Sequence, residues 1–241
     1  MDIDKEISSK DLERLKNIDS PTICNGIETF KVRDETDGYA TSELKCMIPE
    51  LKPMVGFAIT VSVDSTTPAS LEQPRFYEKY SEILDLIKDA SRPVVVVFKD
   101  IGPQRYKCCI TGDMLGTAFS CIGATGVVTD GCMRDLAGLK QNTRGFQVFA
   151  TGLVVSHGIP NILEIGGTVS ICGLIIKPDD LLHGDESGLV KIPIDFIRIS
   201  ELIDRCEEIV QQEKEYFDFM KSDKYNFEDM KKFLIRSSED K

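Results

Sequence analysis

Two short motifs combine residue types that could bind a metal ion and an anionic substrate. The run Gly112-Asp113-Met114-Leu115-Gly116 opens a predicted helix, and the first turn of a helix offers free N–H groups to an anion. The second motif follows an apolar strand, and in it Arg134 could hold a carboxylate while Asp135 offers a hard oxygen ligand to Mg²⁺. Each motif also has a plain structural interpretation, because Asp113 could cap its helix and Arg134 could pair with Asp135.

The two motifs indicate more together than either does alone. Both follow predicted strands in consecutive βα units, so a right-handed parallel arrangement brings Asp113 and Asp135 to the same edge of a sheet. There the two carboxylates could flank one metal ion. The helix N-terminus and Arg134 would then contact the anionic part of a substrate.

Other polar candidates favour plainer interpretations. Residues 183–188 carry His183, Asp185 and Glu186 and are compatible with a proton shuttle, but a solvated hairpin turn is the favoured interpretation. Lys99 could be a Schiff-base lysine, yet a strand-end lysine that reaches solvent is favoured, and Asp130 is interpreted as part of a turn. The common nucleotide-loop, zinc-protease and serine-hydrolase motifs do not occur.

Strands and helices alternate through the middle of the chain, which predicts βαβ units and a partly parallel sheet. The apolar run at residues 93–98 is typical of a strand covered on both faces. Residues 19–53 are expected to be irregular, beginning with a turn at Asp19-Ser20-Pro21. Predicted helices cover residues 11–18, 76–90, 114–122, 134–142 and the chain from Asp195, and predicted strands cover residues 55–61, 93–98, 126–129 and 147–150.

After Gly152 the pattern changes to short strands at residues 168–177, 181–183 and 188–192, separated by turns. These strands leave no room for helices and predict a second, antiparallel or barrel-like β layer beside the α/β part.

Composition narrows the classes of function. The net charge of −11 argues against nucleic acid as the main partner, because phosphate binding needs a basic face. We expect no membrane span, no signal peptide and a cytoplasmic location, with the eight cysteines reduced.

The two motifs give the sequence a resemblance to the RraA-like family, which includes 4-hydroxy-4-methyl-2-oxoglutarate aldolases. The family mark is Gly-Asp, twenty residues, then Arg-Asp, and here twenty residues separate Asp113 from Arg134. The flanking residues 123–131 and 178–193 are also similar to the family. The resemblance covers about residues 15 to 210.

This resemblance implies a three-layer β/β/α swivelling-domain fold, here with an added C-terminal helix, assembled as a homotrimer or hexamer. The expected division is an N-terminal helical segment at residues 1–20, an RraA-like domain at residues 21–194 and a helical extension at residues 195–241.

The resemblance also implies site residues and an activity. Gly112, Asp113, Met114, Leu115 and Arg134 would bind substrate, Arg134 and Asp113 would be catalytic, and Asp135 would ligate Mg²⁺ or Mn²⁺. The implied activity is that of a class II aldolase or decarboxylase, which releases pyruvate from 2-oxo acids such as 4-hydroxy-4-methyl-2-oxoglutarate or oxaloacetate.

One departure from the family pattern leaves an alternative open. Many catalytic members carry an acidic residue three positions after the Arg-Asp aspartate, and here that position is Gly138. The alternative is a non-catalytic regulator that binds a ribonuclease or another basic protein, for which a net charge of −11 is suited.

Overall fold

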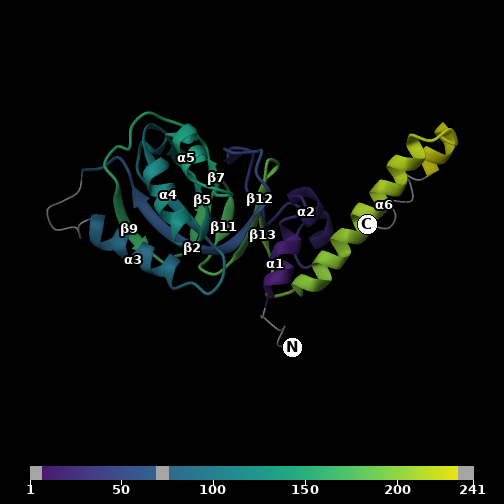
Figure 1. Cartoon of the computed structure of the whole chain (residues 1–241), viewed down its shortest axis with the longest axis horizontal. Coiled ribbons are helices and arrows are strands. Elements are labelled where there is room, and N and C mark those ends of the chain that lie inside the picture. Colours follow the sequence, from purple (N-terminus) through teal and green to yellow (C-terminus); the bar gives the residue numbers. More distant parts are fainter. Residues whose placement is uncertain (1–6, 69–75, 233–241) are drawn as a thin grey trace.

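The computed structural model describes residues 7–68 and 76–232, which form a mixed α/β fold (Figure 1). Its main sheet has the strand order β1-β7-β5-β3-β2-β12-β13, and β9 also pairs with β2. Strands β2, β3, β5 and β7 run parallel to one another. The strands of this sheet are β1 (Lys45–Cys46), β2 (Met54–Asp64), β3 (Val94–Asp100), β5 (Ala124–Thr129), β7 (Gln147–Ala150), β9 (Asn161–Ile165), β12 (Leu181–Asp185) and β13 (Gly188–Ile192).

Two smaller sheets and six α-helices complete the fold. The first small sheet joins β4 (Cys109–Thr111), β6 (Cys132–Met133) and β8 (Gly152–Leu153), and the second is the hairpin of β10 (Val169–Ile171) and β11 (Leu174–Ile176). The helices are α1 (Ser9–Leu15), α2 (Ser20–Glu28), α3 (Phe76–Lys88), α4 (Asp113–Cys121), α5 (Leu136–Asn142) and α6 (Ile199–Met220), with a 3-10 turn η1 (Arg105–Lys107).

The central strand β3 shows why three layers form. Val94, Val96 and Phe98 pack into the core shared with helices α3, α4 and α5, whereas Val95 and Val97 pack into the core shared with hairpin β10–β11. Burying each such side chain contributes roughly 1.5–3 kcal/mol. The predicted β/β/α layers, and a strand covered on both faces, are therefore confirmed.

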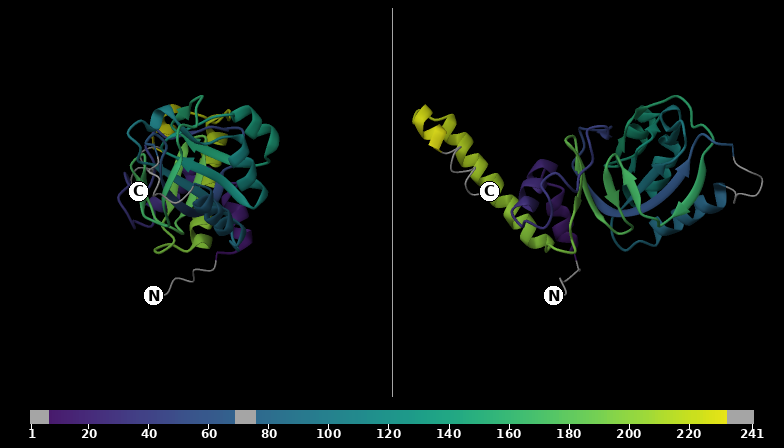
Figure 2. Two further views of the ribbon diagram at one scale, coloured as in Figure 1. Left: turned by 90° about the vertical axis from the view of Figure 1, so that its left-hand side faces the viewer. Right: turned by 180° about the vertical axis from the view of Figure 1, so that it is seen from behind.

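Helices α1 and α2 pack against the first half of α6 and share one core with residues of β2, β12 and β13 at one end of the main sheet (Figures 1 and 2). The contact is close, because a Cβ on Gly26 would lie only 2.6 Å from Cys206 Sγ. Cys206 Sγ also donates a hydrogen bond to the Thr22 carbonyl at 3.5 Å. The added C-terminal helix is confirmed, and it begins at Ile199 rather than at Asp195. The division at residues 20 and 194 stays a prediction.

Two expectations about connecting segments were wrong. Asp19-Ser20-Pro21 does not end in an irregular stretch but starts helix α2, because Asp19 Oδ1 accepts the Thr22 N–H at 2.7 Å and proline is tolerated in a first helical turn. Strand β9 (Asn161–Ile165) was also not expected, and it extends the sheet along the second half of β2.

No helix in the described ranges is long and apolar enough to cross a membrane.

Candidate active site

The sheet β4–β6–β8 places the two motifs side by side. Strands β4 and β6 are parallel, with Thr111 in register with Met133, and the Arg134 N–H donates to the Thr111 carbonyl at 3.1 Å. Gly112 and Arg134 follow directly after this register pair. The prediction that the motifs share one edge is confirmed, although the edge belongs to this small sheet and not to the main one.

Asp135 has a backbone conformation that few side chains adopt. Its φ of 56° and ψ of 35° lie in the left-handed region, which costs a non-glycine residue roughly 1–2 kcal/mol but is tolerated best by Asp and Asn. It precedes α5, yet its side chain caps no N–H of that helix. The carboxylate instead lies 3.0 Å from Arg134 Nε and is 45% exposed. Asp135 therefore presents its carboxylate to solvent, paired with Arg134, and does not cap helix α5.

Two glycines leave room for the two carboxylates. A Cβ on Gly112 would lie 3.1 Å from Asp135 Oδ2 and 3.3 Å from Arg134 Cγ, so the absence of a side chain lets this ion pair rest against the backbone. A Cβ on Gly138 would lie 2.6 Å from Asp113 Oδ2, inside contact distance. The space beside Gly138 is therefore occupied by the carboxylate of Asp113.

The N-terminus of α4 forms the remaining wall. Gly112 is the N-cap residue, and Asp113 Oδ1 accepts the Met114 N–H at 2.7 Å, so Asp113 does satisfy one helix N–H as the plain interpretation expects. Its other oxygen faces Gly138. Met114 is 86% exposed, which leaves it available to a ligand or to a neighbouring surface.

The donor set suits a hard divalent cation that keeps other ligands. In the described part of the chain, no group of three or more His, Cys, Asp or Glu side chains could hold a metal ion. Mg²⁺ is commonly held by one or two carboxylates together with water and substrate oxygens. Asp135, which is 45% exposed, could supply one such carboxylate.

The strand under the site is apolar and uncharged. Cys109 on β4 pairs in register with Cys132 on β6, and both are buried. Burial raises the pKa of the Cys109 thiol to about 11, against the opposing effect of the Arg134 charge. Cys109 is therefore a neutral thiol at physiological pH and supports the site without acting as a nucleophile.

A second polar cluster at the ends of β3 and β5 differs from its predicted form. Lys99 does not simply reach solvent: its Nζ lies 2.5 Å from Oδ2 of Asp130, a carboxylate that is only 3% exposed. Asp130 also accepts the Asp100 N–H at 2.9 Å, and Arg105 Nε lies 3.8 Å away. Asp130 is therefore a buried ion-pair partner and not merely a turn residue. The available signal in the sequence was that Lys99 and Asp130 each follow an apolar run typical of a buried strand.

Residues 183–188 form the predicted hairpin turn, with Glu186 and Ser187 exposed between β12 and β13, but two of its polar residues are not solvated. His183 and Asp185 lie in strand β12, and both are buried. His183 Nδ1 lies 3.0 Å from Ser20 Oγ, His183 Nε2 lies 3.1 Å from the Leu15 carbonyl, and Asp185 Oδ2 accepts the Ser20 N–H at 2.6 Å. These contacts attach α1 and α2 to the sheet. His183 and Asp185 therefore have a structural role, and neither is a solvated turn residue or a proton shuttle.

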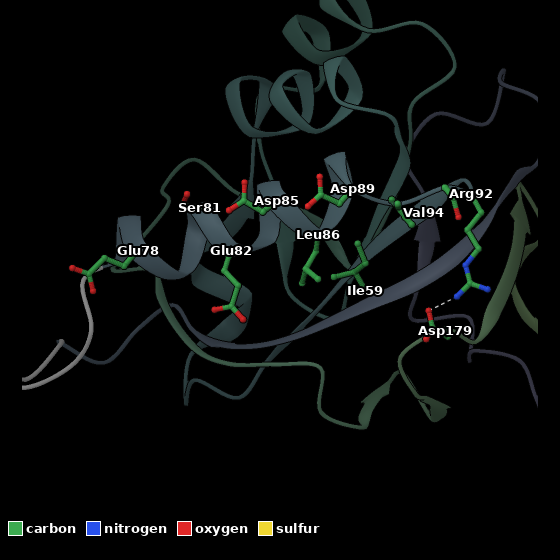
Figure 3. Close-up of a pocket in the computed structure, with 12 residues that line it drawn as sticks. Ile59, Glu78, Ser81, Glu82, Asp85, Leu86, Asp89, Arg92, Val94 and Asp179 are labelled. Carbon is green, nitrogen blue, oxygen red and sulfur yellow. Dashed lines mark hydrogen bonds and ion pairs between the residues drawn. The ribbon is translucent and has the colours of Figure 1, made fainter.

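A cavity of about 700 Å³ lies elsewhere, between α3 and β2 (Figure 3). None of the predicted site residues lines it.

Comparisons with known proteins identify the family of this chain. The RraA-like family model, described as Aldolase/RraA, matches residues 11–191. An uncharacterised protein of Methanocaldococcus jannaschii is 26% identical over 87% of this chain and 88% of its own length. A protein of Halalkalibacterium halodurans, named "Putative 4-hydroxy-4-methyl-2-oxoglutarate aldolase", is 30% identical over 73% of this chain and 77% of its own.

Solved structures show the same fold. An uncharacterised protein from Pseudomonas syringae superposes with a TM-score of 0.70 at 21% identity, covering 94% of this chain and 95% of its own. Streptomyces coelicolor RraAS2, described as an unusual member of the RNase ES inhibitor RraA protein family, gives 0.65 at 20% identity over 87% and 96%. With the family model matched across most of its length, the chain belongs to the RraA-like family.

Proposed function

We propose that this protein is a divalent-metal-dependent carbon–carbon lyase that releases pyruvate from 2-oxo acids such as 4-hydroxy-4-methyl-2-oxoglutarate or oxaloacetate. The observation that carries the proposal is that Gly112, after β4, and Gly138, in α5, leave room for the Arg134–Asp135 pair and for the Asp113 carboxylate, with Asp135 45% exposed. The relatives named as aldolases support the same class of reaction. A homotrimer or hexamer and a cytoplasmic location belong to the same proposal.

The residues divide the work by charge. Asp135 holds the cation, and Arg134, now paired with Asp135 at 3.0 Å, binds the substrate carboxylate. The turn from Gly112 to Leu115 orients the substrate through backbone N–H groups at the start of α4. A bound divalent cation supplies Lewis-acid stabilisation of the negative charge that develops on the 2-oxo group.

In the proposed reaction Asp113 moves the proton. In aldol cleavage the 4-hydroxyl loses its proton to a base, the C3–C4 bond breaks, and its electron pair passes to the fragment that becomes pyruvate. That fragment then takes a proton at C3. Asp113, whose Oδ2 lies against Gly138, would act as the base and return the proton. Decarboxylation of oxaloacetate needs the same charge stabilisation and no base.

The test measures pyruvate release from both substrates together with Mn²⁺ binding by electron spin resonance. We expect release to need Mg²⁺ or Mn²⁺, to stop in EDTA, and to be lost together with Mn²⁺ binding in Asp135→Ala. Release that persists after chelation, or that survives in Asp135→Ala, would contradict the proposal.

The second candidate function is the regulator, because Gly138 stands where many catalytic members of the family carry an acidic residue. A folded protein that releases no pyruvate with either metal, yet captures a basic protein at low salt and loses it at high salt, would favour the regulator.

A further inference from the structure

Helix α6 carries an exposed apolar surface away from the body of the molecule. Its first half is buried, through Leu202, Ile203 and Cys206, but beyond it Val210 is 46% exposed and Phe217 is 47% exposed. The helix spans 22 residues, or roughly 33 Å at 1.5 Å per residue. In Figures 1 and 2 its far end projects beyond α1 and α2, at the opposite end of the molecule from α3. The arm, defined as residues 209–232, therefore reaches into space that this chain does not fill.

The sequence at the end of the arm is basic and apolar in an otherwise acidic chain. Residues 231–236 read Lys-Lys-Phe-Leu-Ile-Arg, with three basic and three apolar side chains and no acid. The described part of the chain ends at Lys232, so Arg236 lies at most about 14 Å further on. Nearby on the arm Phe227 is 61% exposed.

The opposite end of the molecule carries the complementary groove. The cavity of about 700 Å³ between α3 and β2 has an apolar floor that includes Ile59, Leu86 and Val94, and Leu86 is 44% exposed. Figure 3 shows Glu82 and Leu86 projecting from α3 on the side of Ile59. Four carboxylates of α3 line the same groove: Glu78, Glu82, Asp85 and Asp89.

The positive charge at the groove's rim is already paired. Arg92 forms an ion pair with Asp179 and also lies over the Phe57 ring, with its Cζ 3.8 Å from the ring centroid. Arg92 therefore does not neutralise the four carboxylates that line the groove, of which Glu82 projects on the side of Ile59 and Asp85 and Asp89 project from the other side of α3 (Figure 3). An occupant needs apolar side chains for the floor and at least two cationic groups for the acidic wall.

We propose that residues 231–236 of a second copy of this chain dock in the α3 groove. The segment has both properties that the groove requires, and it cannot reach the groove of its own chain, since α6 points away from α3 and Arg236 lies at most about 14 Å beyond Lys232. Donor and acceptor surfaces lie at opposite ends of each molecule, so the contact is head-to-tail and joins copies into a ring or an open chain. This inference does not depend on the proposed reaction.

In the experiment, the photo-crosslinking residue benzoylphenylalanine replaces Phe233 in the full chain. Isotopically heavy and light forms of this protein are then mixed before crosslinking. We expect crosslinks that join a heavy to a light chain and that map to α3. Crosslinks found only within one chain, or between chains but away from α3, would overturn the proposal.

Charge reversal then tests what holds the segment. Glu82→Lys with Asp85→Lys should reduce the crosslink at least tenfold, Lys231→Glu with Lys232→Glu should do the same, and the four changes together should restore it. Glu186→Lys, exposed on another face, is the control and should change nothing. A crosslink indifferent to these reversals, or not restored in the combined variant, would also overturn the proposal. Thermal unfolding of each variant checks that it is folded, and the variants of Lys231 and Lys232 alter only exposed residues.

Discussion

Two regions of this molecule bring carboxylates together with a basic side chain, and they use them in opposite ways. At the β4–β6 edge, Asp135 is 45% exposed, adopts a left-handed backbone and pairs with Arg134 at 3.0 Å. At the junction of β12 and α2, His183 and Asp185 are buried, and protein groups fill their hydrogen bonds. Buried polar groups with satisfied partners stabilise a fold, whereas exposed charges held in a strained backbone remain available to a ligand.

The largest effect on activity is expected from an Asp→Asn change in the exposed region, which is compared with the same change in the buried region. Asp135→Asn keeps the shape and the tolerance for a left-handed backbone but removes the charge that would hold the cation. We expect kcat/KM for pyruvate release to fall roughly 10²–10³-fold, as when a preorganised electrostatic group is lost, with the free energy of unfolding changed by less than about 0.5 kcal/mol. Urea denaturation and the pyruvate assay measure the two quantities.

The matched change, Asp185→Asn, should give the reverse result. Asp185 accepts the N–H groups of Ser20 at 2.6 Å and of Ser187 at 2.8 Å, and an amide cannot accept both as well as a carboxylate does. We expect a loss of about 2–3 kcal/mol in the free energy of unfolding, with kcat per folded molecule unchanged. If instead both Asp→Asn variants lose stability, or both lose activity, the comparison fails.

The pH dependence of stability should come from the buried region. Burial lowers the pKa of His183, although the charges of Asp185 and Asp19 oppose the shift. The unfolded chain therefore takes up a proton near pH 6.5 while the folded chain does not. The contribution is fully present above about pH 6.5, and the free energy of unfolding falls below it by at most about 1.4 kcal/mol per pH unit, until the folded pKa is reached. Denaturation series from pH 8 to 5 measure this slope.

His183→Gln should flatten the same slope, because it removes the titrating group. His157→Gln is the control, since His157 is exposed. A slope that survives in His183→Gln would assign the pH dependence to other groups.

The smallest expected effect concerns Gly138. In Gly138→Ala the new Cβ would lie 2.6 Å from Asp113 Oδ2 and must push that carboxylate aside. We expect a fall of about threefold to tenfold in kcat/KM for aldol cleavage, with stability equal or higher, because alanine favours a helix over glycine by up to about 1 kcal/mol. Oxaloacetate decarboxylation, which needs no base, should change less. Gln141→Ala on the same helix is the control.

The sequence predicted those elements whose hydrophobic pattern lies within a short stretch of residues. The apolar run through Val96 and the helical pattern after Asp113 predicted β3 and α4, because burial on both faces and a helical period leave a signal within ten residues. Helix α2 was missed because Ser20-Pro21 serves equally as a helix start and as a turn. The strands β4 and β6 have three and two residues, too few for any periodicity.

The exposed site at Asp113 and Arg134 and the buried site at His183 also differ in how far the sequence predicted them. The fixed spacing of Asp113 and Arg134 was visible in the sequence, and the parallel pairing of Thr111 with Met133 explains it. The burial of His183 could not be predicted, since its partner Ser20 lies 163 residues away. Whether Arg134, Asp135 and Asp113 catalyse the proposed reaction stays a prediction.

The packing of α2 against α6 has a consequence for how the protein is made. Cys206 and Thr22 touch although they are 184 residues apart. A ribosome adding about 5–20 residues per second makes the connecting chain in roughly 10–40 s. During that interval Ile23 and Ile27, both buried in the finished protein, have no α6 to cover them. Helix α2 is thus made well before the helix that covers it, and its apolar face stays exposed to other chains until α6 follows.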